Sequence, residues 1–204
     1  MKARESGMPD ETWWRSFFDP EGLLARLLSA HDRVGGIVEF GAGYGTFTLP
    51  AARMTSGVVT ALDIDPSMVD RVRQKSEAGG LTNVRAVLRD VVADGTGLAD
   101  SSQTHALIFN LLHLENPVAL LLEARRTLAA GGRVSVLHWR SDIRTPRGPS
   151  LDIRPSPAQC AAWMRVAGFV DVAAVDVEDL CPYHFALVGT MPGASMSVSG
   201  NRRS

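Results

Sequence analysis

Residues 38–46 of this 204-residue chain read Val38-Glu39-Phe40-Gly41-Ala42-Gly43-Tyr44-Gly45-Thr46, and this stretch decides the fold. A short apolar run, typical of a buried strand, leads into it, and an apolar stretch with helical spacing follows. Glycines at this point let the backbone turn sharply and approach a bound molecule without interference from a Cβ atom. The helix N–H groups then face that molecule. The stretch therefore predicts a ligand-binding turn, with a tight turn that binds nothing as the alternative.

Short apolar runs alternate with amphipathic segments on the C-terminal side of this turn. We predict strands at five runs, residues 37–40, 58–62, 84–88, 106–109 and 134–138. Asp65 before Pro66 and Asn116 before Pro117 indicate helix starts with proline at the first helical position. The glycine pairs at 79–80 and 131–132 indicate helix ends. Strands that alternate with helices predict βαβ units and a mostly parallel sheet.

The C-terminal third has a different pattern. Residues 141–157 are rich in Pro, Arg and Asp and predict a long loop, and residues 158–167 predict a helix. Residues 169–177 and 184–188 predict two strands joined by a short polar turn. An antiparallel hairpin therefore closes the predicted sheet.

We divide the chain into three parts. Residues 1–34 form a helical N-terminal segment that is a candidate lid, residues 35–190 form the ligand-binding domain, and residues 191–204 are small and polar and predict a disordered tail. The N-terminal segment carries four aromatic residues at helical spacing, Trp13, Trp14, Phe17 and Phe18. Core packing is the alternative role for these rings.

Composition narrows the class of partner. The formal net charge is −1 with no basic run, which argues against nucleic acid and leaves a small molecule as the expected partner. Cys160 and Cys181 lack metal-ligand spacing, so we expect no metal site, and as isolated thiols they fit a reducing compartment. No apolar run is long enough to span a membrane, and the polar N-terminus does not read as a signal peptide. We therefore expect a cytoplasmic protein.

The spacing of the glycines and the residue before them discriminate between nucleotide ligands. A dinucleotide-binding fingerprint, G-x-G-x-x-G, requires glycine at position 46, where this chain has Thr46, and the third glycine comes one residue early at Gly45. Glu39 at the strand end would repel a pyrophosphate. The same carboxylate would attract a ligand that carries an ammonium and a sulfonium group.

Two further acids follow the next two strands. Asp63 lies about 20 residues beyond the glycine turn, at a position that commonly accepts hydrogen bonds from ribose hydroxyls. Asp90 follows the third strand, where a carboxylate can accept a hydrogen bond from an adenine amino group. An ordinary strand-end or loop acid is the alternative for both positions.

Together these residues resemble the class I S-adenosylmethionine-dependent methyltransferases. The resemblance rests on Glu-x-Gly-x-Gly-x-Gly at 39–45, on Asp63 and Asp90, and on Phe-Asn-Leu-Leu-His at 109–113. Residues 128–132 look like the family's Leu-x-Pro-Gly-Gly turn, with Ala130 in place of proline. The resemblance spans about residues 35–190. It implies an α/β, Rossmann-like three-layer sandwich with a seven-stranded, mostly parallel sheet and an antiparallel last strand.

The resemblance also implies a cofactor, S-adenosylmethionine, whose product is S-adenosylhomocysteine, and a set of binding residues. Its methionine end would lie against Glu39, Gly41, Ala42, Gly43, Tyr44 and Gly45. Asp63 with Ile64 would bind the ribose, and Asp90 with Val91 the adenine. The backbone at Asn110 and Leu111 would receive the amino group.

Methyl transfer from a sulfonium mainly requires alignment of the reacting atoms, and a base is needed only for an acceptor that must lose a proton. We select His113, after the fourth strand, as the candidate catalytic residue. Other acceptor-side candidates are His138, Trp139, Arg140, Tyr183 and His184, and the 141–157 loop offers Arg144, Arg147 and Arg154, with a solvated loop as the alternative. We expect a methyltransferase for a small-molecule acceptor. The alternatives are a non-catalytic S-adenosylmethionine-binding subunit or sensor and an NAD(P)-dependent oxidoreductase.

Overall fold

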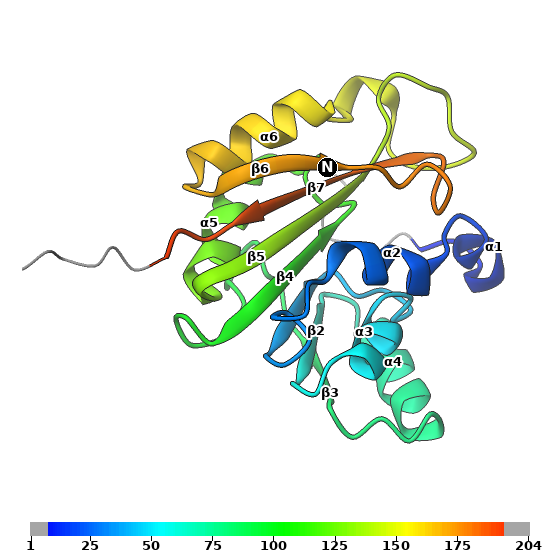
Figure 1. The fold of residues 1–204 in the computed structure, drawn as a ribbon. Helices are drawn as coiled ribbons and strands as arrows, with labels where there is room; N and C mark the ends of the chain where they lie inside the picture. The colour runs from blue at the N-terminus through cyan, green and yellow to red at the C-terminus, as the bar shows by residue number, and fades with distance from the viewer. Residues whose placement is uncertain (1–7, 194–204) are drawn as a thin grey trace, which may run out of the picture.

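In the computed structural model, the described residues are 8–193, and they form one seven-stranded sheet with helices on both faces (Figure 1). The elements in chain order are α1 Glu11–Arg15, α2 Pro20–Leu27, β1 Ile37–Phe40, α3 Thr48–Met54, β2 Val59–Asp63, α4 Pro66–Ala78, β3 Val84–Leu88, β4 Gln103–Phe109, α5 Pro117–Thr127, β5 Leu128–Trp139, a 3₁₀ turn Leu151–Ile153, α6 Pro157–Val166, β6 Val170–Val175 and β7 His184–Thr190. The predicted strands and helices are all present, with ends shifted by a few residues.

The strand order is β3-β2-β1-β4-β5-β7-β6, and the first five strands in this order pair in parallel. β7 runs antiparallel to both β5 and β6, which confirms the antiparallel last strand. Parallel strands send their carboxyl ends to one edge, and the order reverses at β1 and β4. Open α/β sheets bind ligands at this kind of point.

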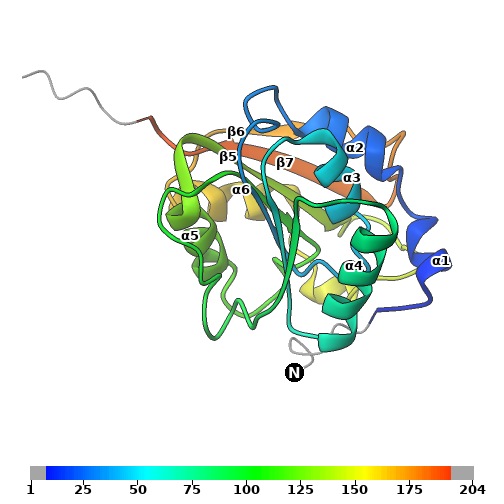
Figure 2. The same cartoon turned by 90° about the horizontal axis from the view of Figure 1, so that it is seen from below.

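Alternate side chains of the central strands pack into two separate hydrophobic cores, one on each face of the sheet. Leu107 and Phe109 of β4 pack with α2 and α3, whereas Ala106 and Ile108 pack with α5 and α6. Figure 2 shows α2, α3 and α4 grouped together and away from α5. Both sheet faces are therefore covered, which gives the three-layer sandwich expected from the sequence.

Proline and a capping side chain start several helices as predicted. Asp65 Oδ1 accepts from the backbone N–H of Ser67 at 2.8 Å, and Asn116 Oδ1 accepts from Ala119 N–H at 3.1 Å. Each cap satisfies an N–H group that has no partner inside the helix. These local bonds fix where α4 and α5 leave the ligand-binding edge.

The predicted helix end at residues 131–132 is wrong. α5 ends at Thr127, and β5 begins at Leu128, which pairs with Gln103 of β4. The β4–β5 register then shifts, and Gly131 takes a φ of 77° inside the strand. Met191 donates to Gly132 O at 2.7 Å and accepts from Gly131 N–H at 3.0 Å. The glycine pair thus bends β5, and Met191, directly after β7, pairs with the bent stretch. Of the predicted tail, residues 194–204 lie outside the described part of the chain.

A buried polar cluster lies at the amino ends of β1 and β4, opposite the glycine turn. Asp32 Oδ2 accepts from Ser29 N–H at 2.7 Å and pairs with Arg133 at 3.0 Å. Its Oδ1 lies 3.2 Å from His105 Nδ1, and His105 Nε2 lies 2.8 Å from Ser135 Oγ. Burial opposes ionisation of Asp32, but its contacts with His105 and Ser29 hold its pKa below the usual range. The Asp–His–Ser order is that of a hydrolase triad, yet all three residues are fully buried, so the cluster is structural.

We predict that Asp32→Ala destabilises the protein by about 3–5 kcal/mol, because it leaves Arg133 and His105 without their buried partner. Urea denaturation followed by circular dichroism measures this change. The control is Asp179→Ala, which removes an exposed partner of Arg26 and should change stability far less. Equal effects of the two substitutions would show that the buried cluster contributes no more stability than the exposed ion pair.

Candidate functional site

A cavity of about 750 Å³ opens at the carboxyl ends of β1, β2 and β4. The predicted site residues that line it are Glu39, Gly41, Ala42, Gly43, Asp63, Ile64, Asp90, Val91, Asn110, Leu111 and His113. Two predicted residues of the glycine turn do not line it: the hydroxyl of Tyr44 donates to Pro9 O, and Gly45 borders a smaller hollow beside α4. The fold therefore brings predicted site residues from four separate chain segments around one cavity.

The glycine turn is shaped by its backbone angles and by Asp63. Gly41 and Gly43 have φ values of 70° and 52°, in the left-handed region that favours glycine. A Cβ on Gly41 would lie 3.2 Å from the Leu111 side chain. Asp63 Oδ2 accepts from Gly43 N–H at 2.7 Å and thus ties the turn to the end of β2. The sequence indicated a ligand role for Asp63 but not this second, organising role.

Glu39 is a carboxylate buried at the end of β1, with only 1% of its surface exposed. The Thr48 hydroxyl donates to Glu39 Oε2, and no Arg or Lys in residues 8–193 forms an ion pair with it. Burial, together with the nearby charge of Asp63, raises the pKa of Glu39 to about 8 despite the bond from Thr48. An ionised carboxylate at this position requires a cation that the described residues do not supply.

Asp90 and Asn110 are two further predicted site residues, and they follow the ends of β3 and β4. Asp90 Oδ1 accepts from Val92 and Ala93 N–H groups, both at 3.0 Å, and so fixes the turn after β3. Asn110 has a φ of 58°, which is rare for a residue with a side chain. Its Oδ1 accepts from Trp139 N–H at 3.2 Å. The side chain of Asn110 therefore holds a strained backbone at the cavity, as is common at functional sites.

Of the acceptor-side candidates, His113 and Trp139 line the cavity. His138 is fully buried behind His113, with its Nε2 3.3 Å from His113 Nδ1. Arg140 pairs with Asp142 on the surface, and the ring of Tyr183 packs against Phe17. The ring centroid of His184 lies 4.1 Å from that of Trp139, so it packs behind that wall.

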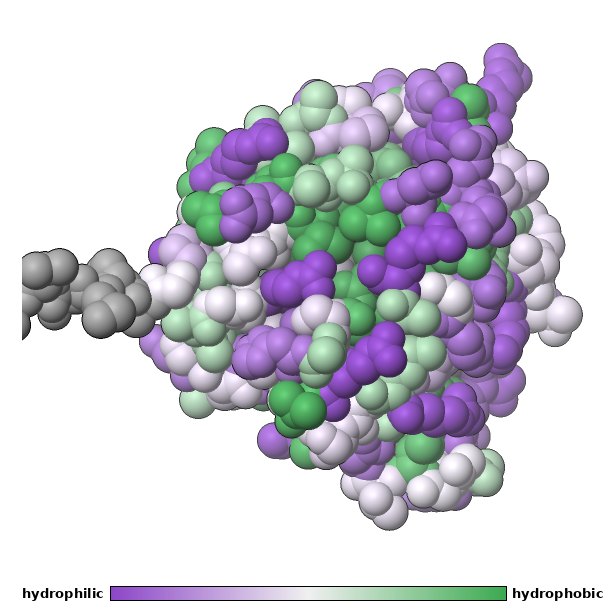
Figure 3. Space-filling view, viewed as in Figure 1, coloured by the Kyte–Doolittle hydropathy of each residue, from purple (hydrophilic) through white to green (hydrophobic). Residues whose placement is uncertain are grey.

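The N-terminal segment covers one side of the cavity. Met8 and Trp14 line it, and Trp14 Nε1 donates to Thr46 Oγ1 at 3.1 Å. Glu11 pairs with Lys75 and Arg71 of α4. Hydrophilic side chains dominate the side of the molecule where α1 lies (Figure 3). The N-terminal aromatic residues thus have two roles: Trp14 lines the cavity, whereas Phe17 and Phe18 are buried in the hydrophobic core.

The 141–157 loop covers another side. Arg147, Gly148, Pro149 and Ile153 line the cavity. Arg154 is buried and donates to the carbonyls of Pro149, Arg140 and Arg147 at 2.7, 2.9 and 3.1 Å. Its guanidinium lies 5.9 Å from the Trp139 ring. Arg154 therefore holds the loop in place through carbonyl groups of the loop and of Arg140, directly after β5.

The described residues contain no helix that is long and apolar enough to cross a membrane. Within the same part of the chain, no group of three or more His, Cys, Asp or Glu side chains could hold a metal ion. Cys160 and Cys181 are both free and buried.

Comparisons with known proteins agree with this geometry. A family model described as a methyltransferase domain matches residues 37–132. The chain is 28% identical over 123 residues to the aklanonic acid methyltransferase DauC of Streptomyces sp. (strain C5), covering 58% of the chain and 54% of that protein. It is 29% identical over 185 residues to the tRNA U34 carboxymethyltransferase of Alcanivorax borkumensis, covering 83% and 55%. The chain thus spans about half the length of the curated relatives it matches.

A solved structure shows the same fold. A SAM-dependent methyltransferase from Aquifex aeolicus superposes with a TM-score of 0.75 at 21% identity, covering 89% of this chain and 94% of that one. The likeness confirms the Rossmann-like sandwich predicted from the sequence.

We predict that Glu39→Gln stabilises the ligand-free protein increasingly as the pH rises from 5 to 8. The folded-state pKa of Glu39, about 8, lies above the ordinary value of 4.5, so the unfolded chain loses this proton first. The stability contributed by neutral Glu39 is therefore complete below about pH 4.5 and is lost as the pH rises through 8, by at most about 1.4 kcal/mol per pH unit. The glutamine side chain cannot ionise, so the Glu39→Gln variant retains this stability over the whole pH range.

Urea denaturation of wild type and Glu39→Gln at several pH values measures this difference. Glu123→Gln is the control, because Arg126 lowers the pKa of Glu123 to about 2 and its effect should stay constant over this range. A pH-independent difference between wild type and Glu39→Gln would contradict the raised pKa.

Proposed function

We propose that the chain is a class I S-adenosylmethionine-dependent methyltransferase that transfers the methyl group of this cofactor to a small-molecule acceptor in the same cavity. The single observation that carries this function is the buried carboxylate of Glu39 beside a glycine turn. A cofactor with an ammonium and a sulfonium group supplies the positive charge that this position requires. A dinucleotide would bring a pyrophosphate to the same place, which disfavours an oxidoreductase.

The lining residues fit the parts of this cofactor. We assign the methionine end to Glu39 and the turn at Gly41, Ala42 and Gly43, where a side chain at Gly41 would close the space beside Leu111. Asp63 would accept from the ribose hydroxyls, because a carboxylate has four lone-pair positions and two of them already hold backbone N–H groups. Asp90 and Val91 would face the adenine.

S-adenosylmethionine supplies an activated methyl group when it is bound. The task of the chain is then to bring an acceptor atom into line with that group and to exclude water. Trp14, Phe47, Phe109 and Trp139 give the cavity aromatic walls. His113 is the residue we assign to the proton of the acceptor, because it is the imidazole that lines the cavity within residues 8–193.

A small-molecule acceptor is supported by the size and closure of the cavity. About 750 Å³ is typical of small-molecule sites, and segments from the N-terminus and the 141–157 loop both border it. One relative is named for tRNA, so RNA is the competing class of acceptor. The net charge of −1 favours the small molecule, because phosphate binding depends on clustered Lys and Arg. The buried free thiols support a reducing compartment such as the cytoplasm.

We also propose that residues 8–15, which lie within the candidate lid segment 1–34, cover the cavity as a lid. Its polar contacts join Pro9 to Tyr44, Glu11 to α4 and Trp14 to Thr46, and the Trp14 ring also packs against Phe18 and Trp139. The polar surface contacts contribute little stability each, so opening this segment to admit ligands mainly costs the ring contacts of Trp14.

We predict that S-adenosylhomocysteine raises the melting temperature and that NAD does not. A ligand that binds only the native state stabilises it by about 2.7 kcal/mol at 100 times its dissociation constant. Differential scanning fluorimetry with matched concentrations of the two ligands measures the shift. Equal stabilisation by NAD, or no shift with millimolar S-adenosylhomocysteine, would overturn the proposed cofactor.

A further inference from the structure

Two histidines form a pair at the acceptor side of the cavity. His113 lines the cavity after β4, and His138 of β5 is fully buried behind it. His113 Nδ1 lies 3.3 Å from His138 Nε2, and the ring centroids lie 5.4 Å apart. The distance between the nitrogens fits a hydrogen bond, so one ring donates and the other accepts.

The backbone determines which ring donates. His138 Nδ1 lies 3.1 Å from Trp139 O, and a carbonyl oxygen can only accept. The Nδ1 atom of His138 therefore carries a proton. His138 is neutral at pH 7, because burial, with smaller effects of His113 and Arg154, lowers its pKa to about 4. Its Nε2 consequently has a free lone pair directed at His113.

His113 must then donate from Nδ1. Burial also lowers the pKa of His113, so it too is neutral and has a single ring proton. With that proton on Nδ1, its Nε2 has none. Since Nδ1 faces His138, Nε2 lies on the other edge of the ring.

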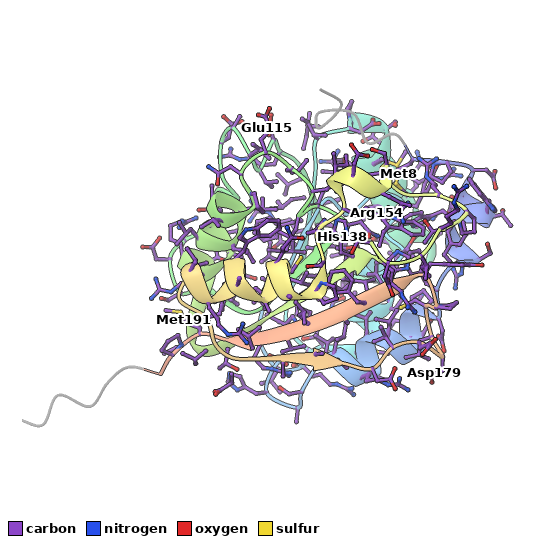
Figure 4. The ribbon with its side chains drawn as sticks, turned by 90° about the horizontal axis from the view of Figure 1, so that it is seen from above. Met8, Glu115, His138, Arg154, Asp179 and Met191 are labelled. Carbon is purple, nitrogen blue, oxygen red and sulfur yellow. The ribbon has the colours of Figure 1, made fainter. Side chains whose placement is uncertain are left out.

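The charges around the pair are consistent with a neutral base. Arg154 acts on His138 from the 141–157 loop, and the two side chains lie close together in the view from above (Figure 4). His184 of β7 is also buried and has a pKa well below its ordinary value. No carboxylate in residues 8–193 forms an ion pair with either ring of the pair, in contrast to His105, which faces Asp32. His113 can therefore hold an extra proton only briefly.

We propose that His138 is a positioning residue that fixes His113 in the Nδ1–H tautomer, so that His113 Nε2 accepts a proton from the methyl acceptor. This inference rests on the proposed function and narrows its substrate class to acceptors that must lose a proton, such as a hydroxyl, a phenol or an enolisable carbon. The acceptor gives its proton to Nε2, its freed electron pair bonds to the methyl carbon, and the methyl–sulfur pair leaves with the sulfur. The proton then passes from His113 to water.

Long-range ¹H–¹⁵N correlation spectra of histidine-labelled, ligand-free protein report which ring nitrogen carries each proton. The chain has five histidines, so single substitutions assign every signal. We expect wild-type His113 and His138 both to carry the proton on Nδ1. In His138→Leu, which removes the acceptor, His113 should lose this single tautomer. His138→Gln retains an acceptor oxygen and should restore it, while the His105 signals stay unchanged as the internal control.

An Nε2–H tautomer of His113 in wild type, or an Nδ1–H tautomer that persists in His138→Leu, would overturn the proposal. The wild-type spectrum decides the matter even if the leucine variant does not fold. Calorimetry of wild type with S-adenosylhomocysteine, run separately, keeps the two hypotheses apart. Absence of binding would refute the proposed function without changing the tautomer result.

Discussion

The site depends on the cost of burying a carboxylate. Glu39 lies in the centre of the sheet, almost without exposure, and its neighbour in space is a second acid, Asp63. Two buried acids at one strand edge oppose each other's ionisation, and the protein gives up stability to keep them there. A bound cation would relieve both costs. Under the proposed function, the ligand provides the positive charge that the described residues do not supply.

The surrounding structure holds the residues that line the cavity in place. Asp63 holds the glycine turn through Gly43, and the Asn110 side chain holds a strained backbone at the end of β4. Elsewhere at the cavity, Arg154 holds the 141–157 loop beside the ring of Trp139. Each of these residues uses backbone groups as partners, so the positions of the strand ends are transmitted directly to the cavity walls.

Much of this arrangement was predictable from the sequence because it follows from local rules. Proline with a preceding Asp or Asn marked the starts of α4 and α5, and apolar runs marked the strands. Parallel pairing then brings strand ends together, so Glu39, Asp63 and Asn110 could be assigned to one edge. Three features had no local signal. Asp32 and Arg133 are 101 positions apart in the sequence, and Trp14 and Thr46 are 32 positions apart. Gly131 bends within β5, where it pairs with Met191, the residue directly after β7. Such contacts exist only after the chain has folded.

Proton release on ligand binding tests the central claim most directly. Because Glu39 has a pKa of about 8 in the ligand-free protein, it holds its proton at pH 7 and must lose it when a cation binds beside it. Titration calorimetry of S-adenosylhomocysteine at pH 7, in two buffers of different ionisation enthalpy, measures this release. We predict about one proton released per molecule bound to wild type, and none with adenosine or with Glu39→Gln. Binding without proton release, at an affinity that Glu39→Gln retains, would contradict the claim that the Glu39 carboxylate is the centre of the site.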